Sequence, residues 1–157
     1  MINKNEIINL LELNLQESYN TTKKGYEIAM VDARAAEGAM QSRYSSAKEE
    51  NHELAQNYIL KMNELEKSLG LLHFWKSNLK IQNEAISGAL IELRITGKTE
   101  KLWYFLFPVG GYEITTTIGQ KIITLNTQSP LGKALLRQKS GNTVIVRNQE
   151  YEIISII

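Results

Sequence analysis

The chain has 157 residues, 18 basic and 17 acidic side chains, a formal net charge of +1, and no cysteine. Without cysteine it forms no disulfide and no cysteine-ligated zinc or iron–sulfur site, and two histidines are too few for a multi-histidine metal site. The balanced charge gives no reason to expect a polybasic nucleic-acid coat or membrane binder.

The sequence leads us to expect neither a membrane span nor a signal peptide. Its apolar runs fall short of the roughly 18–20 residues that a membrane span needs. The N-terminal residues Met1-Ile2-Asn3-Lys4-Asn5-Glu6 lack the charged-then-apolar layout of a signal peptide. We therefore expect a cytoplasmic protein with no membrane partner.

Charge and turn residues divide the chain into two parts. Residues 1–77 hold 9 basic and 11 acidic residues, whereas residues 78–157 hold 9 basic and 6 acidic ones. Both prolines and seven of the ten glycines lie in the second part, which is therefore rich in turns. We predict two domains, 1–77 and 78–157.

The first part carries two apolar seams at helical spacing. The first seam comprises Ile8, Leu11, Leu15, Tyr19, Thr22, Tyr26, Ala29, Ala33 and Ala36, and the second comprises Leu54, Tyr58, Met62 or Lys61, Leu65, Leu69 and Leu72. Each helix alone exposes an apolar stripe, and antiparallel pairing buries both. We predict a hairpin with its tip near 37–43 and arms of roughly 30–35 residues, about 45–50 Å long. A coiled coil that dimerises through these seams is the alternative.

The second part has the pattern of a small β-rich domain. Strand-forming runs occupy 89–95, 101–107, 121–125, 143–146 and 151–156, with turns at 96–99 and 147–149. Ser129 and Pro130 fit the N-cap and first position of one helix. One helix on one face of an antiparallel sheet makes the predicted fold class α+β.

The sequence contains almost no motif that indicates catalysis or metal binding. Gly110-Gly111 is not followed by the lysine–serine/threonine pair of a phosphate loop, so we interpret it as a turn or bulge. His52 and His73 have no metal-ligand spacing. The aromatic run at 103–107 has no interleaved arginine, which favours core packing over base stacking. From the residues alone, the chain is a helical finger with a β module, and a binding protein rather than an enzyme.

One segment of the second part resembles a known family. Thr127-Gln128-Ser129-Pro130-Leu131-Gly132-Lys133-Ala134-Leu135-Leu136, downstream of an antiparallel coiled coil, is similar to the Gre transcript-cleavage factors of bacteria. The match continues through 140–146 and 151–153, with Asn142 where the family usually has aspartate. It covers most of 88–157 at the level of motifs, with Ser129, Pro130, Leu131, Gly132 and Lys133 as its centre. It covers 1–77 mainly as architecture.

The resemblance implies a fold, a partner and a mechanism. The C-terminal domain would be FKBP-like and would bind bacterial RNA polymerase, while the coiled coil enters the secondary channel of that enzyme. In the family, two acidic residues at the tip help to hold a second magnesium ion in the polymerase active site. That ion activates the water that cuts backtracked RNA.

The tip is where the sequence departs from the family. The candidate tip residues are Glu37, Met40, Gln41, Ser42, Arg43 and Tyr44. Anchoring on Tyr44 places Glu37 on the family aspartate but Met40 on the family glutamate. Methionine is a poor ligand for magnesium, which prefers oxygen. Glu37 alone would then share a magnesium ion with polymerase, and we expect weak or absent stimulation of cleavage.

We therefore predict an RNA-polymerase-binding elongation regulator. It would be a monomer with no catalytic residue and no cofactor of its own, and it would meet magnesium and nucleic acid only in the polymerase complex. Two alternatives stay open: an FKBP-like peptidyl-prolyl isomerase, since fold does not give function, and a coiled-coil assembly protein.

Overall fold

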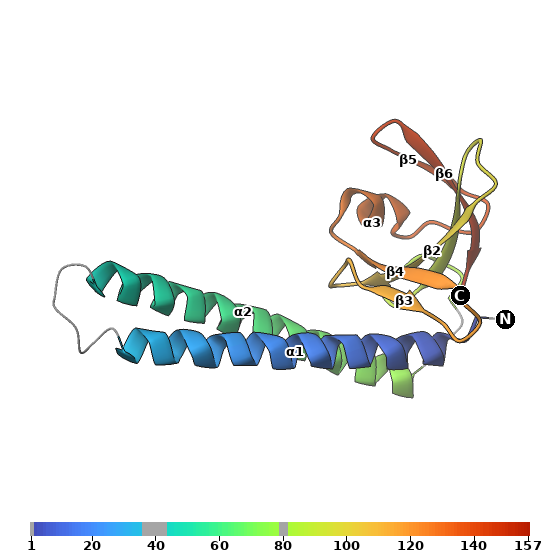
Figure 1. The fold of residues 1–157 in the computed structure, drawn as a ribbon. Helices are drawn as coiled ribbons and strands as arrows, with labels where there is room; N and C mark the ends of the chain where they lie inside the picture. The colour runs from blue at the N-terminus through green and yellow to red at the C-terminus, as the bar shows by residue number, and fades with distance from the viewer. Residues whose placement is uncertain (1, 36–43, 79–81) are drawn as a thin grey trace. The chain divides into compact units, whose positions relative to one another are not determined.

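In a computed structural model, the structure describes residues 2–35, 44–78 and 82–157. The elements follow in the order α1 (Lys4–Ala35), α2 (Tyr44–Ser77), β1 (Leu90–Ile95), β2 (Lys101–Phe107), β3 (Glu113–Thr115), β4 (Lys121–Asn126), α3 (Pro130–Leu135), β5 (Thr143–Val146) and β6 (Gln149–Ile156) (Figure 1). They form two compact units. The hairpin unit is Glu12–Leu71, and the sheet unit is Met1–Leu11 together with Leu72–Ile157. An N-terminal helical hairpin followed by a six-stranded sheet confirms the α+β class.

The two long helices pair antiparallel, as predicted. Tyr19 of α1 donates a hydrogen bond from its hydroxyl to Glu66 of α2 at 2.8 Å. Six residues further along α1, Gly25 lies against Tyr58, earlier in α2. The helices have 32 and 34 residues, within the predicted range. Neither they nor α3 contains an apolar stretch long enough to cross a bilayer.

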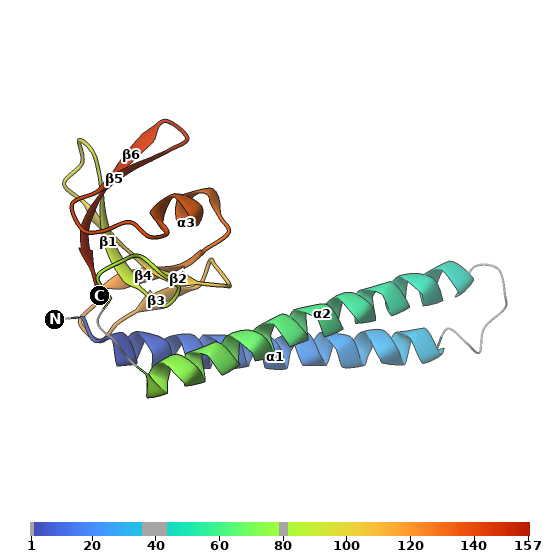
Figure 2. The same cartoon turned by 180° about the vertical axis from the view of Figure 1, so that it is seen from behind.

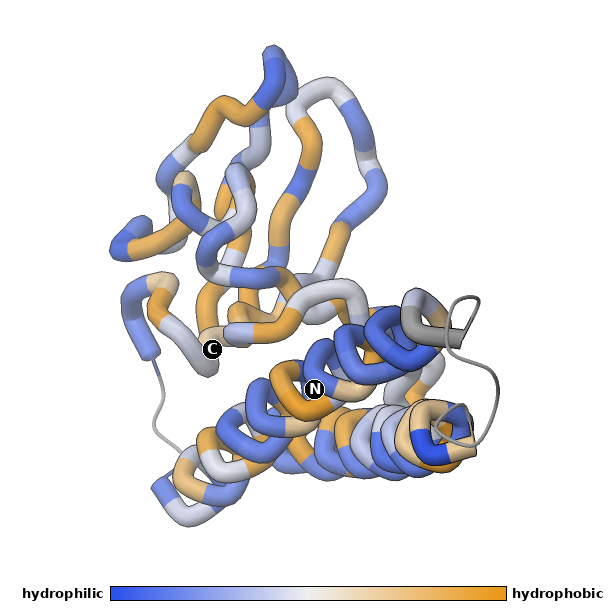
Figure 3. Tube along the Cα trace, turned by 90° about the vertical axis from the view of Figure 1, so that its left-hand side faces the viewer, coloured by the Kyte–Doolittle hydropathy of each residue, from blue (hydrophilic) through white to orange (hydrophobic). Residues whose placement is uncertain are grey.

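The seam of α1 is confirmed. Its buried members are Ile8, Leu11, Leu15, Thr22, Ala29 and Ala33, all at 5% exposure or less. Tyr19 and Tyr26 are half-buried, and Ala36 lies outside the described residues. Apolar and polar segments alternate along both helices, as expected when only one stripe of each is buried (Figure 3).

The seam of α2 contains one wrong prediction. Leu65 and Leu72 are buried and Tyr58 is half-buried, but Leu54 is 43% exposed. Ala55 takes its place at 3% exposure. Starting from residue 55, the steps to 58, 62, 65, 69 and 72 alternate between three and four, which keeps the stripe on one face. Starting from 54 instead gives two consecutive steps of four, from 54 to 58 and from 58 to 62.

The sheet is mixed rather than antiparallel, which corrects the prediction. Its strand order is β3-β4-β2-β1-β6-β5, and β2 pairs parallel with β4 while the other pairs are antiparallel. The sequence pattern missed β3, which is only three residues long and pairs antiparallel with β4. Because β3 reverses the chain once more after β2, β4 runs in the same direction as β2.

Each face of the sheet has its own core. On one face, α3 covers a buried cluster that includes Ile91, Leu93, Leu106, Leu135 and Ile153 (Figure 2). Side chains alternate along strands, so the neighbours Phe105 and Phe107 point to the other face and are fully buried there. This confirms core packing for these two members of the predicted aromatic run, whereas Trp103 and Tyr104 are half-buried.

The ends of both long helices belong to the sheet unit. Trp75 of α2 packs edge-on against Phe105 and Phe107, with ring centroids 6.0 and 5.7 Å away. From α1, Lys4 donates to the main-chain oxygen of Ile157 at 3.1 Å, and Glu6 accepts from the main-chain N–H of Thr117. Burial lowers the pKa of Lys4. Two aromatic contacts of Trp75 and two hydrogen bonds, from Lys4 and to Glu6, thus hold these helix ends to the sheet.

Candidate functional site

The predicted tip site lies outside the described residues. Glu37, Met40, Gln41, Ser42 and Arg43 all fall in the undescribed segment 36–43. Tyr44 is the first residue of α2, and its side chain is not described either. The predicted loss of one magnesium-binding carboxylate at the tip therefore stays a prediction from the sequence.

Carboxylates outnumber cations on the parts of the hairpin next to this segment. Asp32 and Arg34 are exposed on the last turn of α1, and Glu49, Glu50 and Glu53 are exposed in the first three turns of α2. Yet nowhere in the described residues do three side chains of the metal-ligating kind come together. These acidic residues make the surface of the hairpin negative next to segment 36–43. Among the described residues they form no cluster that could hold a metal ion.

The apolar side chains buried between the two helices are smaller toward the tip of the hairpin. Large residues such as Leu11, Leu15 and Leu65 are buried in its first half, whereas Ala33 and Ala55 are buried in its second half. Between the halves, a Cβ added at Gly25 would lie 2.7 Å from the ring of Tyr58. Small residues at a helix–helix contact permit close approach of the two backbones.

The family-like motif forms the start of α3, as predicted. Ser129 adopts an extended backbone, and its hydroxyl accepts from the N–H of Gly132 at 3.0 Å, with Pro130 in the first turn. The same hydroxyl donates to the main-chain oxygen of Asn126 at 2.7 Å. This is the N-cap that the sequence indicated.

Gly132 is required by its close approach to the main chain before the helix. A Cβ at this position would lie 2.1 Å from the main-chain oxygen of Asn126. Leu131 is half-buried against the core below α3, while Lys133 is exposed. Three motif residues thus cap and fit the helix and a fourth packs in the core. Pro130 and Lys133 are the exposed residues of the motif.

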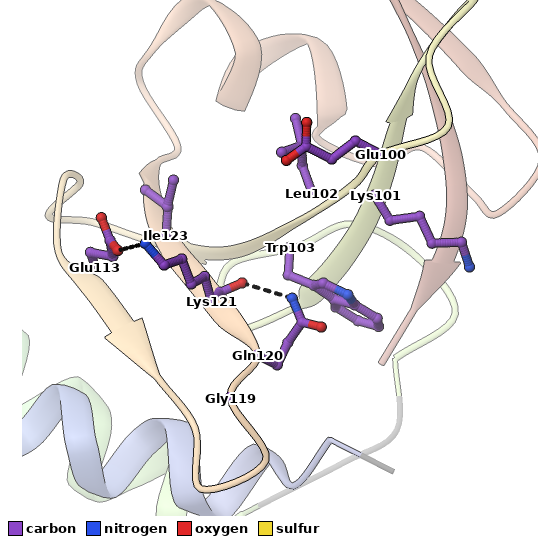
Figure 4. A pocket seen from close by; sticks show the side chains of 9 residues that line it. All are labelled: Glu100, Lys101, Leu102, Trp103, Glu113, Gly119, Gln120, Lys121 and Ile123. Carbon is purple, nitrogen blue, oxygen red and sulfur yellow. Dashed lines mark hydrogen bonds and ion pairs between the residues drawn. The ribbon is translucent and has the colours of Figure 1, made fainter.

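A cavity that sequence reasoning missed opens where β2 and β4 begin (Figure 4). It has a volume of about 430 Å³ and is lined by Glu100, Lys101, Leu102, Trp103, Glu113, Gly119, Gln120, Lys121 and Ile123. Lys121 pairs with Glu113 at 3.0 Å, and Lys101 pairs with Glu92 at 2.8 Å. Its lysines are thus neutralised within the fold. No sequence signal marks this cavity because only the folded sheet brings its two lining segments, 100–103 and 113–123, together.

A tyrosine on the α3 side of the sheet has a shifted pKa. Burial raises the pKa of Tyr104, and the neighbouring Tyr151 raises it further. A tyrosine with a raised pKa stays neutral at physiological pH and is a weaker candidate for acid–base work there.

Comparison with known proteins gives structural neighbours only. No protein-family model matches the sequence, and no curated protein matches it. Among solved structures, the chain is similar to GreA factor homolog 1 (Gfh1) of Thermus thermophilus, with 14% identity and a TM-score of 0.37 over 93% of this chain and 94% of that chain. Gfh1 of Thermus aquaticus gives 14% identity and a TM-score of 0.36 over 91% of each chain.

Proposed function

We propose that the chain is a transcription elongation regulator that binds bacterial RNA polymerase and inserts its hairpin into the secondary channel. In this role it stimulates transcript cleavage weakly or not at all. It acts as a monomer without a cofactor of its own, and it meets magnesium and RNA only within the polymerase complex.

The observation that carries this proposal is the long antiparallel hairpin. Helices of 32 and 34 residues extend about 48–51 Å at 1.5 Å per residue. Small residues are buried in the distal half of the hairpin, and exposed carboxylates outnumber exposed cations next to the tip segment. Such a shaft suits a channel that leads to a metal-containing site. The capped α3, formed by the family-like motif, supports the resemblance that names the partner.

The tip sequence supports a regulator rather than a cleavage factor. Glu37 is the one carboxylate in the sequence from residue 36 to residue 48. A hard cation held between two proteins gains most of its affinity from charged oxygen ligands, and Met40 offers sulfur instead. With one carboxylate in place of two, the protein occupies the channel without recruiting the second magnesium ion.

Variants of Met40 test this proposal. The wild-type protein is titrated against RNA polymerase for binding, then added with magnesium to polymerase carrying backtracked RNA. We expect binding without robust cleavage. Met40→Glu, which restores a second carboxylate, is expected to increase the cleavage rate at least about tenfold, the effect of roughly 1.4 kcal/mol on the barrier. Met40→Gln is the matched control, of similar length but neutral, and leaves the rate low.

Two results overturn the proposal at different points. Absence of binding to polymerase at low salt, where polar contacts are strongest, overturns the partner. Robust RNA cleavage by the wild-type protein overturns the loss of the second metal ligand, and Glu37→Ala is then expected to abolish that cleavage.

A further inference from the structure

The outer face of α1 carries two large apolar side chains that the hairpin does not bury. Ile28 is 63% exposed and Val31 is 62% exposed, whereas Ala29 and Ala33 belong to the buried seam. Residues three apart on a helix are neighbours on its surface, so Ile28 and Val31 lie on the same face. β-branched residues are mediocre helix formers. The stability of α1 therefore does not explain why both stand in water.

The two side chains border a groove along α1. A hollow of about 340 Å³ is lined by Lys24, Glu27, Ile28, Val31 and Asp32. All five residues are exposed and belong to the hairpin unit, so they share one surface. Residues four apart form ridges on a helix, and here residues 24, 28 and 32 form one ridge and residues 27 and 31 the next. Packing the ridge of one helix into such a groove on another is the commonest way in which two helices meet.

The charges around the groove are placed symmetrically about Ile28. Lys24 lies four residues before it and Asp32 four residues after it, and neither has an ion pair with a described residue. In an antiparallel pair of identical helices, residues equally far from the two-fold axis face each other. An axis at Ile28 thus sets Lys24 of each copy opposite Asp32 of the other.

Other arrangements of the same face bring like charges together. Parallel packing in register sets Lys24 against Lys24 and Asp32 against Asp32. An antiparallel axis midway between Ile28 and Val31 sets Glu27 opposite Asp32. Like charges at such distances repel, so the charge pattern selects the antiparallel pair centred on Ile28.

We propose that this groove is a self-association surface, on which a second copy of the chain packs its own α1 antiparallel. Ile28 and Val31 form the apolar centre, and a Lys24–Asp32 pair lies at each end. Stable protein interfaces bury about 1,200–2,000 Å² in total, and one helix face of two to three turns offers less. The pair is therefore weak and depends on concentration, with a dissociation constant of about 0.1–1 mM.

Pairing covers part of the hairpin, which has a consequence that rests on the proposed function. A hairpin whose outer face is occupied by a second copy cannot insert into a channel at the same time. Self-association then competes with polymerase binding, and the single chain is the form that acts. The self-association is measured without polymerase, so its failure is distinct from a failure of the proposed function.

The test follows the mean mass of the full-length chain by sedimentation equilibrium, from about 10 µM to 1 mM at low salt. Lys24→Glu leaves only acidic residues at the two ends of the ridge, and Asp32→Lys leaves only basic ones, so each variant repels its own copy. An equimolar mixture of the two brings opposite charges together again at both ends. Lys23→Glu is the matched control, because Lys23 is exposed but does not line the groove. Circular dichroism records the helix content of every variant.

We expect the mean mass of the wild-type chain and of the control to rise with concentration from 17.9 kDa toward twice that value. Each charge variant alone should associate at least about fivefold more weakly, and their mixture should recover the wild-type association. Ile28→Ala should also weaken association at least about fivefold. Leu13→Ala, at a residue 67% exposed elsewhere on α1, should not.

Three results overturn the proposal. The first is a wild-type chain that stays a monomer at 1 mM. The second is a mixture that associates no better than its two components, because the contact is then not two-fold about Ile28. The third is an Ile28→Ala variant that loses affinity for RNA polymerase but keeps its self-association, because the groove then contacts the polymerase instead.

Discussion

Replacing Gly132 with alanine is expected to disrupt the start of α3. The new Cβ would lie 2.1 Å from the main-chain oxygen of Asn126, well inside the 3.4 Å at which ordinary contact begins. That oxygen accepts from the N–H of Ser129 at 3.0 Å and from its hydroxyl at 2.7 Å. A main-chain oxygen cannot rotate away as the end of a flexible side chain can. Relief of the clash therefore requires a shift of the backbone that breaks the hydrogen bonds of the Ser129 cap.

The expected cost follows from these contacts. Loss of the Ser129 cap costs about 1 kcal/mol, and overpacking adds about 1–3 kcal/mol, for a total of about 2–4 kcal/mol. In a chain of this length that lowers the melting temperature by roughly 5–15 °C. Tryptophan fluorescence reports it directly, since Trp75 and Trp103 both lie in the sheet unit.

Gly70→Ala is the matched control for this prediction. Gly70 lies within α2, and a Cβ there meets no atom within 4 Å. Alanine is a better helix former by about 1 kcal/mol, so this variant should stabilise the hairpin, as followed by circular dichroism at 222 nm. A Gly132→Ala variant that melts at the wild-type temperature would refute the account of the motif as a structural cap.

Three further changes test the packing and the pH response. Trp75→Ala should lower the free energy of unfolding in urea by about 2–4 kcal/mol because Trp75 packs on Phe105 and Phe107. Phe74→Ala, at a neighbouring residue that is 61% exposed, should lower it by less than about 1 kcal/mol. Equal losses in the two variants would contradict the packing. Leu65→Ala should speed amide exchange in the hairpin, and Leu60→Ala, at a 67% exposed residue, should not; faster exchange in both would disprove the seam. The raised pKa of Tyr104 means that the free energy of unfolding falls as pH rises through about 10, because the unfolded side chain ionises first. Tyr104→Phe should make that fall shallower between pH 9 and pH 11, and an unchanged slope would show that Tyr104 does not contribute.

The hairpin could be predicted from the sequence because its signal is periodic. One stripe must be buried in each helix, and the apolar residues spaced three or four apart identify nearly all members of the seam. Leu54 is the exception: it is 43% exposed, whereas Ala55, the next residue, is buried at 3% and keeps the alternation of three and four. The cap at Ser129 and Pro130 was predictable for a similar reason, since its signal is local.

The parts that could not be predicted depend on contacts between distant segments. β3 is three residues long and carries no strand pattern of its own, and without it the parallel pairing of β2 with β4 could not be foreseen. The sequence also does not predict the left-handed backbone of Arg137 and Arg147, because such positions are normally marked by glycine. The sequence analysis placed the β5–β6 turn at 147–149, but β6 already begins at Gln149.

A competition experiment on backtracked complexes tests the central claim most directly. RNA polymerase with backtracked RNA and magnesium is supplied with an active cleavage factor of the Gre family, and this protein is titrated in while the rate of RNA cleavage is followed. If the hairpin occupies the same channel without recruiting a second magnesium ion, the protein alone gives no robust cleavage and lowers the rate given by the active factor to near the intrinsic level. Robust cleavage by the protein alone, or an unchanged rate at saturating concentration, would contradict the account.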